Sequence, residues 1–287
     1  MKYAFIQQHC KDHPVIRLCQ ALNVSASGYY DWRGRPESRR VNNNNRLLTK
    51  IKCFHKASHE IYGSPRIHQD LLDSGEKTGV NRVARLMKKA GIQSKVAKKF
   101  VVTTDSKNTL APAPDHLERH FAKDQPNQAW VSDTTFIATR QGWLYLAIIL
   151  DLFSRQVIGW AMGDKNNRQL VIDALTMAIW RRGKVRDVIV HSDQGSTYTS
   201  ADYRQLLVDS GLKGSMSRKG ECLDNAVAES FFGSLKTEWV DHKDYRSKSE
   251  AKQSLFEYIE VFYNRQRRHS YLDYLCPEEF ERQYASQ

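Results

Sequence analysis

The order of apolar segments after residue 128 restricts the fold of this chain more than any other feature. Residues 130–137 and 143–150 have the apolar, β-branched and aromatic composition of strands, and residues 156–162 follow after a short turn. Three closely spaced strands of this kind predict an antiparallel meander.

Helical periodicity follows the meander and alternates with two further short strands. The expected helices cover residues 167–180, 201–211 and 226–240, and the expected strands cover residues 188–191 and 213–217. A meander followed by strand–helix alternation predicts an α/β domain with a mixed five-stranded sheet flanked by helices.

Three acidic residues occupy notable places in this pattern. Asp133 lies inside a predicted strand, where a charged side chain is costly unless it has a function. Asp193 follows the strand at 188–191, at the carboxyl end where open α/β sheets bind ligands. Glu229 lies one turn into the last predicted helix of the domain. Taken singly, each acid is better interpreted without a catalytic role: Asp133 as a strand-edge residue, Asp193 as a turn former and Glu229 as a solvated helix charge.

The helix around Glu229 has an open face. Glu229, Gly233 and Lys236 follow one another at i, i+4 and i+7, which places them on one side of the helix. Lys236 is therefore a candidate for contact with a phosphate near the acids. Three carboxylates offer only oxygen ligands, which favours Mg²⁺ or Mn²⁺. Two such ions can serve phosphodiester chemistry.

The spacing of the acids and the segments around them resemble a known superfamily. Asp133 and Asp193 are separated by 59 residues, and Asp193 and Glu229 by 35. This resembles the Asp, Asp-35-Glu signature of retroviral integrases and bacterial transposases, which share a ribonuclease H-like fold. Residues 126–135, 191–198 and 224–236 are most similar to the insertion sequence 3 family, specifically to the product of its downstream reading frame, OrfB.

The resemblance implies a DNA transposase that cleaves phosphodiester bonds at the element ends and joins them to target DNA. It implies two Mg²⁺ or Mn²⁺ ions, with Asp133 bridging both and Asp193 and Glu229 each completing one site. It further implies terminal inverted repeats and target DNA as substrates, a homo-oligomeric synaptic complex, and an upstream reading-frame (OrfA) partner or fusion. The alternatives are a nuclease of the same fold that cuts without joining, and a DNA-binding regulator without catalysis.

Charge is distributed unevenly along the chain. Residues 1–125 contain 23 Lys and Arg against 11 Asp and Glu, whereas residues 126–287 contain 21 of each, so the net charge of +12 belongs to the first part. A basic excess confined to one region indicates nucleic-acid binding. We expect a helix-turn-helix-like segment at 1–40, a second such domain at 45–102, a linker at 103–127, the catalytic core at 128–240 and a helical tail at 241–287.

The two basic units have recognisable helix signals. Ser25 is expected to cap a helix, and residues 33–45, with four consecutive Asn, are interpreted as a linker. Ser64 is the expected cap of the next helix, with Pro65 at its first position. A further helix ends at Gly91 and presents a cationic outer face that either contacts DNA or is simply solvated; its basic residues are Arg82, Arg85, Lys88 and Lys89.

Two further groups are DNA-contact candidates. Arg218 and Lys219 precede the helix of Glu229, where surface solvation is the alternative. The second group lies in a C-terminal segment that resembles the family's tail, and consists of Asn264, Arg267, Arg268 and His269. The segment at residues 62–67 resembles the family's helix-turn-helix segment.

Other site classes find little support in the sequence. The five Cys are scattered and contain no Cys-x-x-Cys pair, which argues against a disulfide framework and fits a reducing cytoplasm. His55 with His59, and His116 with His120, have ligand-like spacing but lack a following Cys pair, so zinc is not expected. No apolar run is long enough to span a membrane.

Overall fold

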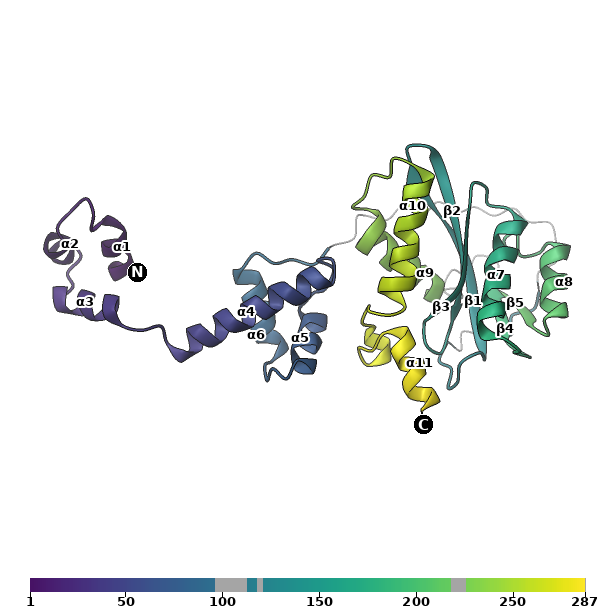
Figure 1. The fold of residues 1–287 in the computed structure, drawn as a ribbon, viewed down its shortest axis with the longest axis horizontal. Coiled ribbons are helices and arrows are strands. Elements are labelled where there is room, and N and C mark those ends of the chain that lie inside the picture. Colours follow the sequence, from purple (N-terminus) through teal and green to yellow (C-terminus); the bar gives the residue numbers. More distant parts are fainter. Residues whose placement is uncertain (96–112, 118–120, 218–225, 287) are drawn as a thin grey trace.

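The computed structural model describes residues 1–95, 113–117, 121–217 and 226–286. Three groups of elements follow one another along the molecule: the helices α1–α3, the helices α4–α6, and a sheet covered by helices (Figure 1). Within these residues, no helix is long and apolar enough to cross a membrane.

The first group is a small three-helix cluster formed by α1 (Lys2–His9), α2 (Val15–Ala21) and α3 (Ala26–Gly34). Ile6, Cys19 and Tyr29 form its buried core. The hydroxyl of Ser25 accepts a hydrogen bond from the amide of Gly28, so the predicted cap is confirmed.

The predicted linker at residues 33–45 is wrong over most of its length. Helix α4 runs from Arg39 to Ala57 and includes all four consecutive Asn residues. Ser38 caps it by accepting a hydrogen bond from the amide of Val41, and Leu47 and Ile51 are buried further along. Capping and burial outweigh the weak helix propensity of Asn, as tertiary context commonly does.

Helices α5 (Ser64–Asp73) and α6 (Val80–Lys89) complete the second group. Gly63, not Ser64, is the N-cap of α5, so Pro65 occupies the second helical position. Gly91 follows α6 with a φ of 68°, a left-handed conformation that glycine adopts at little cost and that ends the helix as predicted.

The sheet has five strands in the order β3-β2-β1-β4-β5. The meander β1 (Ala129–Thr139), β2 (Gly142–Asp151) and β3 (Val157–Gly163) is antiparallel, whereas β4 (Ile189–Ser192) and β5 (Lys213–Met216) add in parallel. The predicted mixed sheet and its five strands are therefore confirmed.

Helices cover both faces of the sheet, and this explains why β2 is almost wholly apolar. Leu144, Leu146 and Ile148 point into a core shared with the C-terminal helices, whereas Ala147 and Ile149 point into the core beneath α7 (Arg168–Arg182). Helix α7 approaches β3 closely at Gly159, where an added Cβ would lie 2.2 Å from the carbonyl oxygen of Ala174. Helix α8 (Ala201–Asp209) contacts α7 and β5.

The opposite face is covered by α9 (Ala226–Leu235), the π-helical turn η2 (Lys236–Val240) and α10 (Lys248–Phe256) (Figure 1). The π-helical η3 (Glu257–Tyr263), a short 3₁₀ turn (Ser270–Leu272) and α11 (Pro277–Ala285) end the chain. Asp224 and Asn225, which precede α9 and from the sequence are candidates for its N-cap, lie outside the described residues. Of the predicted linker at 103–127, the described part includes the amide of His116, which donates to Ser215 Oγ on β5 (2.9 Å).

Candidate active site

The sheet places two of the predicted acids at the same level. β4 pairs with β1 only at Ala129, Trp130 and Val131, so the edge of β1 beyond Val131 is open on that side. Val131 lies opposite His191 in this parallel pair. Asp133 and Asp193 each follow two residues later, so both acids lie just past the end of the β1–β4 ladder.

Short hydrogen bonds orient both aspartates. Asp133 Oδ1 accepts from the amide of Thr134 (2.7 Å), and Asp193 Oδ1 accepts from the amide of Gly195 (2.9 Å). A Cβ at position 195 would lie 2.9 Å from Asp193 Oδ1, so glycine keeps this turn compact. Each of these bonds engages one oxygen, Oδ1, of its carboxylate.

The third acid, Glu229, lies in the first turn of α9 and is exposed. Gly233 is also exposed, and a Cβ there would meet no atom within 4 Å, so this helix face is open as predicted. Lys236 Nζ lies 5.3 Å from the ring centre of Phe136 on β1, and its charge acts on Asp133.

Burial and mutual repulsion oppose ionisation of the acids. Burial, then the charge of Asp193 and to a smaller extent that of Glu229, raise the pKa of Asp133 to about 8, although the Thr134 amide and Lys236 act in the opposite direction. Burial also raises the pKa of Asp193 and of Glu229. The site thus concentrates negative charge that a cation would stabilise.

The three acids are neighbours, but their carboxylates are not arranged as a complete metal-binding site. Among the residues that the structure describes, no three His, Cys, Asp or Glu side chains lie together closely enough to hold a metal ion. Glu229 acts on Asp133 electrostatically from an exposed helix face. A bound cation would therefore have to draw Glu229 towards the two aspartates.

Buried polar residues that the sequence pattern did not single out support the aspartates from behind. The Ser132 hydroxyl lies 3.1 Å from the carbonyl oxygen of Ile148 and 3.0 Å from the Tyr198 hydroxyl. His191 Nδ1 lies 2.9 Å from Ser215 Oγ, and Nε2 lies 3.2 Å from Ser217 Oγ. The only sequence signal for this network is that Ser132 and His191 stand beside the acids inside apolar strands.

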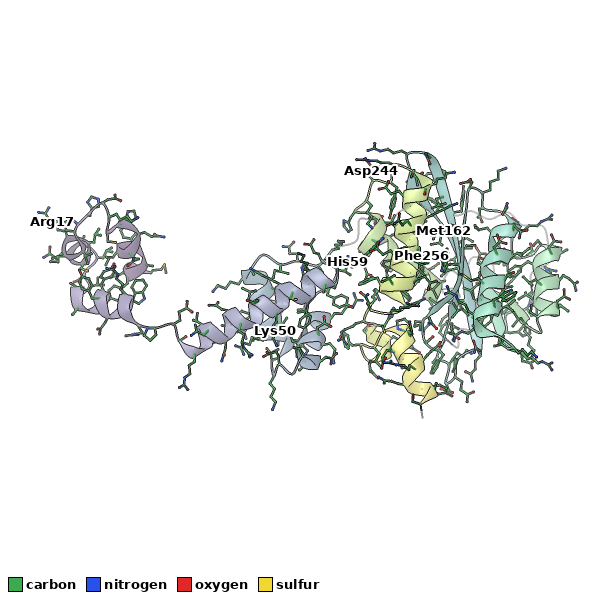
Figure 2. The ribbon with its side chains drawn as sticks, viewed as in Figure 1. Arg17, Lys50, His59, Met162, Asp244 and Phe256 are labelled. Atoms are coloured by element: carbon green, nitrogen blue, oxygen red, sulfur yellow. The ribbon has the colours of Figure 1, made fainter. Side chains whose placement is uncertain are left out.

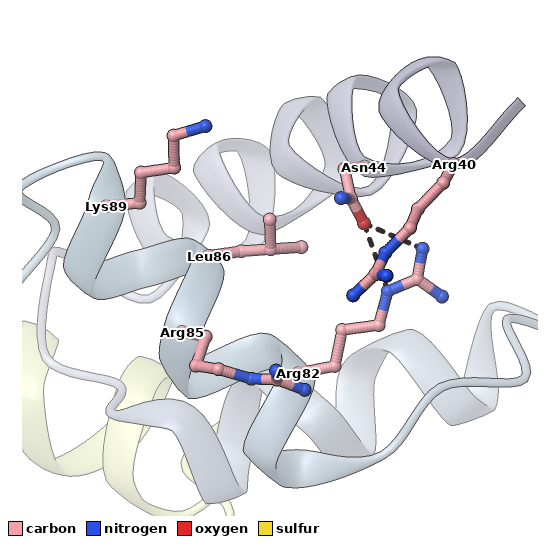
Figure 3. Close-up of a pocket in the computed structure, with 6 residues that line it drawn as sticks. All are labelled: Arg40, Asn44, Arg82, Arg85, Leu86 and Lys89. Carbon is pink, nitrogen blue, oxygen red and sulfur yellow. Dashed lines mark hydrogen bonds between the residues drawn. The ribbon is translucent and has the colours of Figure 1, made fainter. Parts of the chain in front are cut away.

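The predicted cationic face of α6 forms one wall of a hollow whose other wall is α4 (Figure 3). Arg82 is held in place because its guanidinium donates to Asn44 Oδ1 at 2.7 and 3.1 Å. The remaining cations of this α4–α6 groove are Arg40, Arg85 and Lys89. Lys88 instead lines a second hollow beside Gly63. Arg218 and Lys219 lie outside the described residues.

The C-terminal candidates lie inside the protein or at an internal contact, which argues against the DNA contacts expected for them. The Asn264 amide is buried and pairs with the backbone of Val157, as both donor and acceptor. Arg267 is 3% exposed and donates to both oxygens of Glu238 at 2.6 Å. Arg268 binds Asp70, and burial followed by nearby guanidinium charge lowers the pKa of His269 to about 2, so this ring is neutral.

Comparison with known proteins agrees with the fold. Models of the integrase core domain match residues 123–222 and 229–284, and an HTH-like domain model matches residues 42–100. The chain is 43% identical over 267 residues (93% of this chain, 98% of the relative) to the insertion element IS600 uncharacterized 31 kDa protein of Shigella sonnei. It is 41% identical over 284 residues (98% of each chain) to the transposase InsF for insertion sequence IS3A of Escherichia coli (strain K12).

Two solved structures are similar to this chain at low sequence identity. The HTLV-2 integrase catalytic core domain in complex with magnesium is 18% identical, with a TM-score of 0.42 over 55% of this chain and 98% of that chain. A chain of the simian T-cell lymphotropic virus intasome is 13% identical, with a TM-score of 0.47 over 80% of this chain and 74% of that chain.

Proposed function

Because the chain belongs to the insertion sequence 3 family of transposases, with an integrase core domain, we propose that Asp133, Asp193 and Glu229 are its catalytic residues and bind two Mg²⁺ or Mn²⁺ ions. In this proposal Asp133 would be a ligand of both ions, and Asp193 and Glu229 would each be a ligand of one. When bound, the two ions would activate the attacking oxygen and stabilise the leaving oxygen.

The observation that supports this proposal most strongly is the position of Asp133. It lies level with Asp193 at the open edge of β1, within electrostatic reach of Glu229 and Lys236, and its pKa is raised to about 8. Carboxylates so placed are poorly stable as anions without a cation. Their oxygen-only donor set suits Mg²⁺ or Mn²⁺ better than zinc.

The proposed reaction has two balanced steps. Water attacks the phosphorus at an element end, the P–O3′ bond breaks, and the departing oxygen takes a proton to give a free 3′-hydroxyl. That hydroxyl then attacks a phosphorus in target DNA, loses its proton and forms a new P–O bond, while the P–O3′ bond of the target breaks and the displaced 3′ oxygen takes up a proton. Lys236, on the same helix face as Glu229, would bind a phosphate oxygen next to the reacting one.

We further propose that the α4–α6 groove contacts DNA. Arg40, Arg82, Arg85 and Lys89 bring four positive charges to one hollow, and a phosphate backbone would relieve their mutual repulsion. Arg40 and Asn44 come from the segment that the sequence pattern had suggested to be a linker. Lys88, Arg218 and Lys219 remain weaker candidates. We assign residues 45–102, together with the first turns of α4, to DNA binding, 128–240 to catalysis and 241–287 to a helical tail, with a linker at 103–127.

The partners proposed for this chain follow from its family. They are the terminal inverted repeats and target DNA, further copies of the chain in a synaptic complex, and the OrfA product as partner or fusion. Cytoplasmic action on the bacterial chromosome follows from the same reasoning.

A strand-transfer assay distinguishes a transposase from a nuclease that only cuts. Pre-cut element ends with free 3′-hydroxyls are mixed with the full chain, Mg²⁺ and a supercoiled target, with and without the OrfA product. Joined products support the proposal. Cleavage of uncut ends without any joining of pre-cut ends would favour the nuclease.

A further inference from the structure

The C-terminal segment that was predicted to contact DNA instead meets the start of α5. Tyr62, just before α5, donates its hydroxyl to the carbonyl oxygen of Gln266 (3.1 Å) and accepts from the amide of Arg268 (2.8 Å). Arg268 also donates to Asp70 on α5 (2.6 Å) and pairs with Asp73. The α4–α6 unit is thereby docked onto the C-terminal tail.

Apolar contacts continue the same interface. The ring of His59 lies 4.8 Å from that of Trp239 and 5.5 Å from that of Phe262, both edge-on. Figure 2 shows His59 at the side of the α4–α6 unit that faces the C-terminal helices. One continuous cluster of buried side chains includes Leu47 of α4 and Phe262 of the tail. The two units therefore share a core.

A buried carboxylate, Glu238 on η2, is the ionic centre of this interface. Arg267 from the tail donates to both of its oxygens at 2.6 Å, and the hydroxyl of Tyr258 donates to Oε2 at 3.0 Å. Arg66 from α5 donates to Oε1 at 3.4 Å. Glu238 is 7% exposed, so this carboxylate depends on protein cations rather than on water.

Glu238 and Glu229 belong to one continuous helical segment, because η2 begins directly after Leu235, the last residue of α9. Nine residues of helix correspond to about 13 Å along the axis and roughly two and a half turns. Glu229 thus faces the active site on one side of the segment, while Glu238 is anchored on the opposite side. Restraining Glu238 restrains the rotation and translation of the helix that bears Glu229.

We propose that Arg66 is a positioning residue for catalysis, through which docking of the α4–α6 unit fixes the helix that carries Glu229. The proposal rests on the catalytic role proposed for Glu229. Arg267 reaches the Glu238 carboxylate from the tail, whereas Arg66 reaches it from the α4–α6 unit, so of these two ionic contacts to the carboxylate the Arg66 contact depends on docking. Arg66 loses hydration when its unit docks, and the Glu238 carboxylate provides the compensating charge.

The test compares Arg66→Met with Arg46→Met in the full-length chain. Arg46 lies in the same unit and pairs with Glu76, but it is 61% exposed and belongs to a different ion pair. Hydrogen–deuterium exchange of residues 226–240 is measured first, without metal or DNA. We expect faster exchange there in Arg66→Met, wild-type exchange in Arg46→Met, and unchanged protection of residues 47–57 in both.

Function is measured next on an element-end duplex. We expect Arg66→Met to cleave about 10- to 100-fold more slowly, as displacement of a catalytic group from its productive position would cause. DNA affinity without metal should stay within about twofold, and Arg66→Lys should restore part of the rate. Equal exchange and equal cleavage in Arg66→Met and Arg46→Met would overturn the proposal.

A separate variant distinguishes this proposal from the proposed function. If Glu229→Gln cleaves like the wild type, the catalytic assignment fails, whereas the exchange comparison still decides whether Arg66 restrains the helix. If Glu229→Gln is inactive and hydrogen–deuterium exchange at residues 226–240 is the same in Arg66→Met as in the wild type, the catalytic assignment stands. The proposed coupling of Arg66 to the Glu229 helix then fails.

Discussion

Replacing Arg267 with Met should strongly destabilise the chain, because it removes one partner of a buried ion pair. Arg267 is 3% exposed and donates to both oxygens of Glu238 and to Ser234 Oγ. Breaking such a pair from one side costs about 3–5 kcal/mol, since the remaining charge stays buried. Arg66 at 3.4 Å and Tyr258 at 3.0 Å still compensate Glu238 in part. We therefore expect the lower end of the range, about 3 kcal/mol.

The matched control is Arg265→Met. Arg265 pairs with Glu278 at 3.0 Å, but both side chains are more than half exposed, at 62% and 53%. An exposed pair contributes about 0–1 kcal/mol, so this variant should unfold almost like the wild type. Arg265 and Arg267 are two residues apart in the same segment, so the difference in stability between the two variants reports the effect of burying the ion pair.

Urea unfolding followed by circular dichroism measures the effect. With a slope of about 3 kcal/mol per M, Arg267→Met should lower the midpoint by about 1 M, and Arg265→Met by about 0.3 M or less. Adding Glu238→Gln to Arg267→Met removes the unpaired charge and should recover part of the loss. A midpoint for Arg267→Met equal to that of Arg265→Met would refute the assignment of Arg267 to the buried network.

Four further predictions concern the metal site, the groove and the sheet. Because the pKa of Asp133 is about 8 without metal, Mg²⁺ must displace a proton, so calorimetric Mg²⁺ affinity should rise about tenfold per pH unit up to pH 8 and then level off. The same raised pKa makes the metal-free fold less stable as pH rises from about 4 to 8, because Asp133 ionises at lower pH in the unfolded chain than in the folded protein. In thermal melts with EDTA, Asp133→Asn should remove this loss of stability, and a pH profile equal to that of the wild type would contradict the prediction. Arg85→Ala should weaken binding to all DNA sequences alike and reduce the slope of log affinity against log salt by about 1, whereas loss confined to one sequence would argue for base reading instead. Gly159→Ala should lower the free energy of unfolding by about 1–3 kcal/mol, because the added Cβ would overlap the carbonyl oxygen of Ala174. A melting temperature equal to that of the wild type would show that α7 can move away from β3.

The sheet could be predicted well from the sequence because the composition of a strand depends on whether one or both of its faces are buried. β2 is almost wholly apolar because helices cover both of its faces, and the ends of β1, β3 and β4 fall within two residues of the predicted ends. The acids were found through their spacing, since the register that brings Asp133 level with Asp193 is not visible in either segment alone.

Helix α4 was missed because its first turns are polar. The features that stabilise it are the Ser38 cap, the burial of Leu47 and Ile51, and the bond from Arg82 to Asn44. The last of these joins residues that are 38 positions apart. Local propensity at four consecutive Asn contains no information about such a partner.

The tail residues were misjudged for a related reason. A segment rich in Asn, Arg and His fits either a DNA surface or a buried polar network, and composition does not separate the two. Arg267 is buried because it pairs with Glu238, which lies 29 residues earlier in the chain, and Arg268 faces the protein because it pairs with Asp70, which lies 198 residues earlier. Only the three-dimensional arrangement shows that these charges are used within the protein.

The most direct test of the central claim is cleavage of an element-end duplex by Asp193→Asn in Mg²⁺. The substitution keeps the size of the side chain and its capacity to accept the Gly195 amide, but it removes the charge needed for a metal ligand. Asp209→Asn, an exposed acid at the end of α8, is the control. We predict that Asp193→Asn binds the duplex normally and does not cleave it, while Asp209→Asn does both. Cleavage by Asp193→Asn at the wild-type rate would contradict the catalytic assignment.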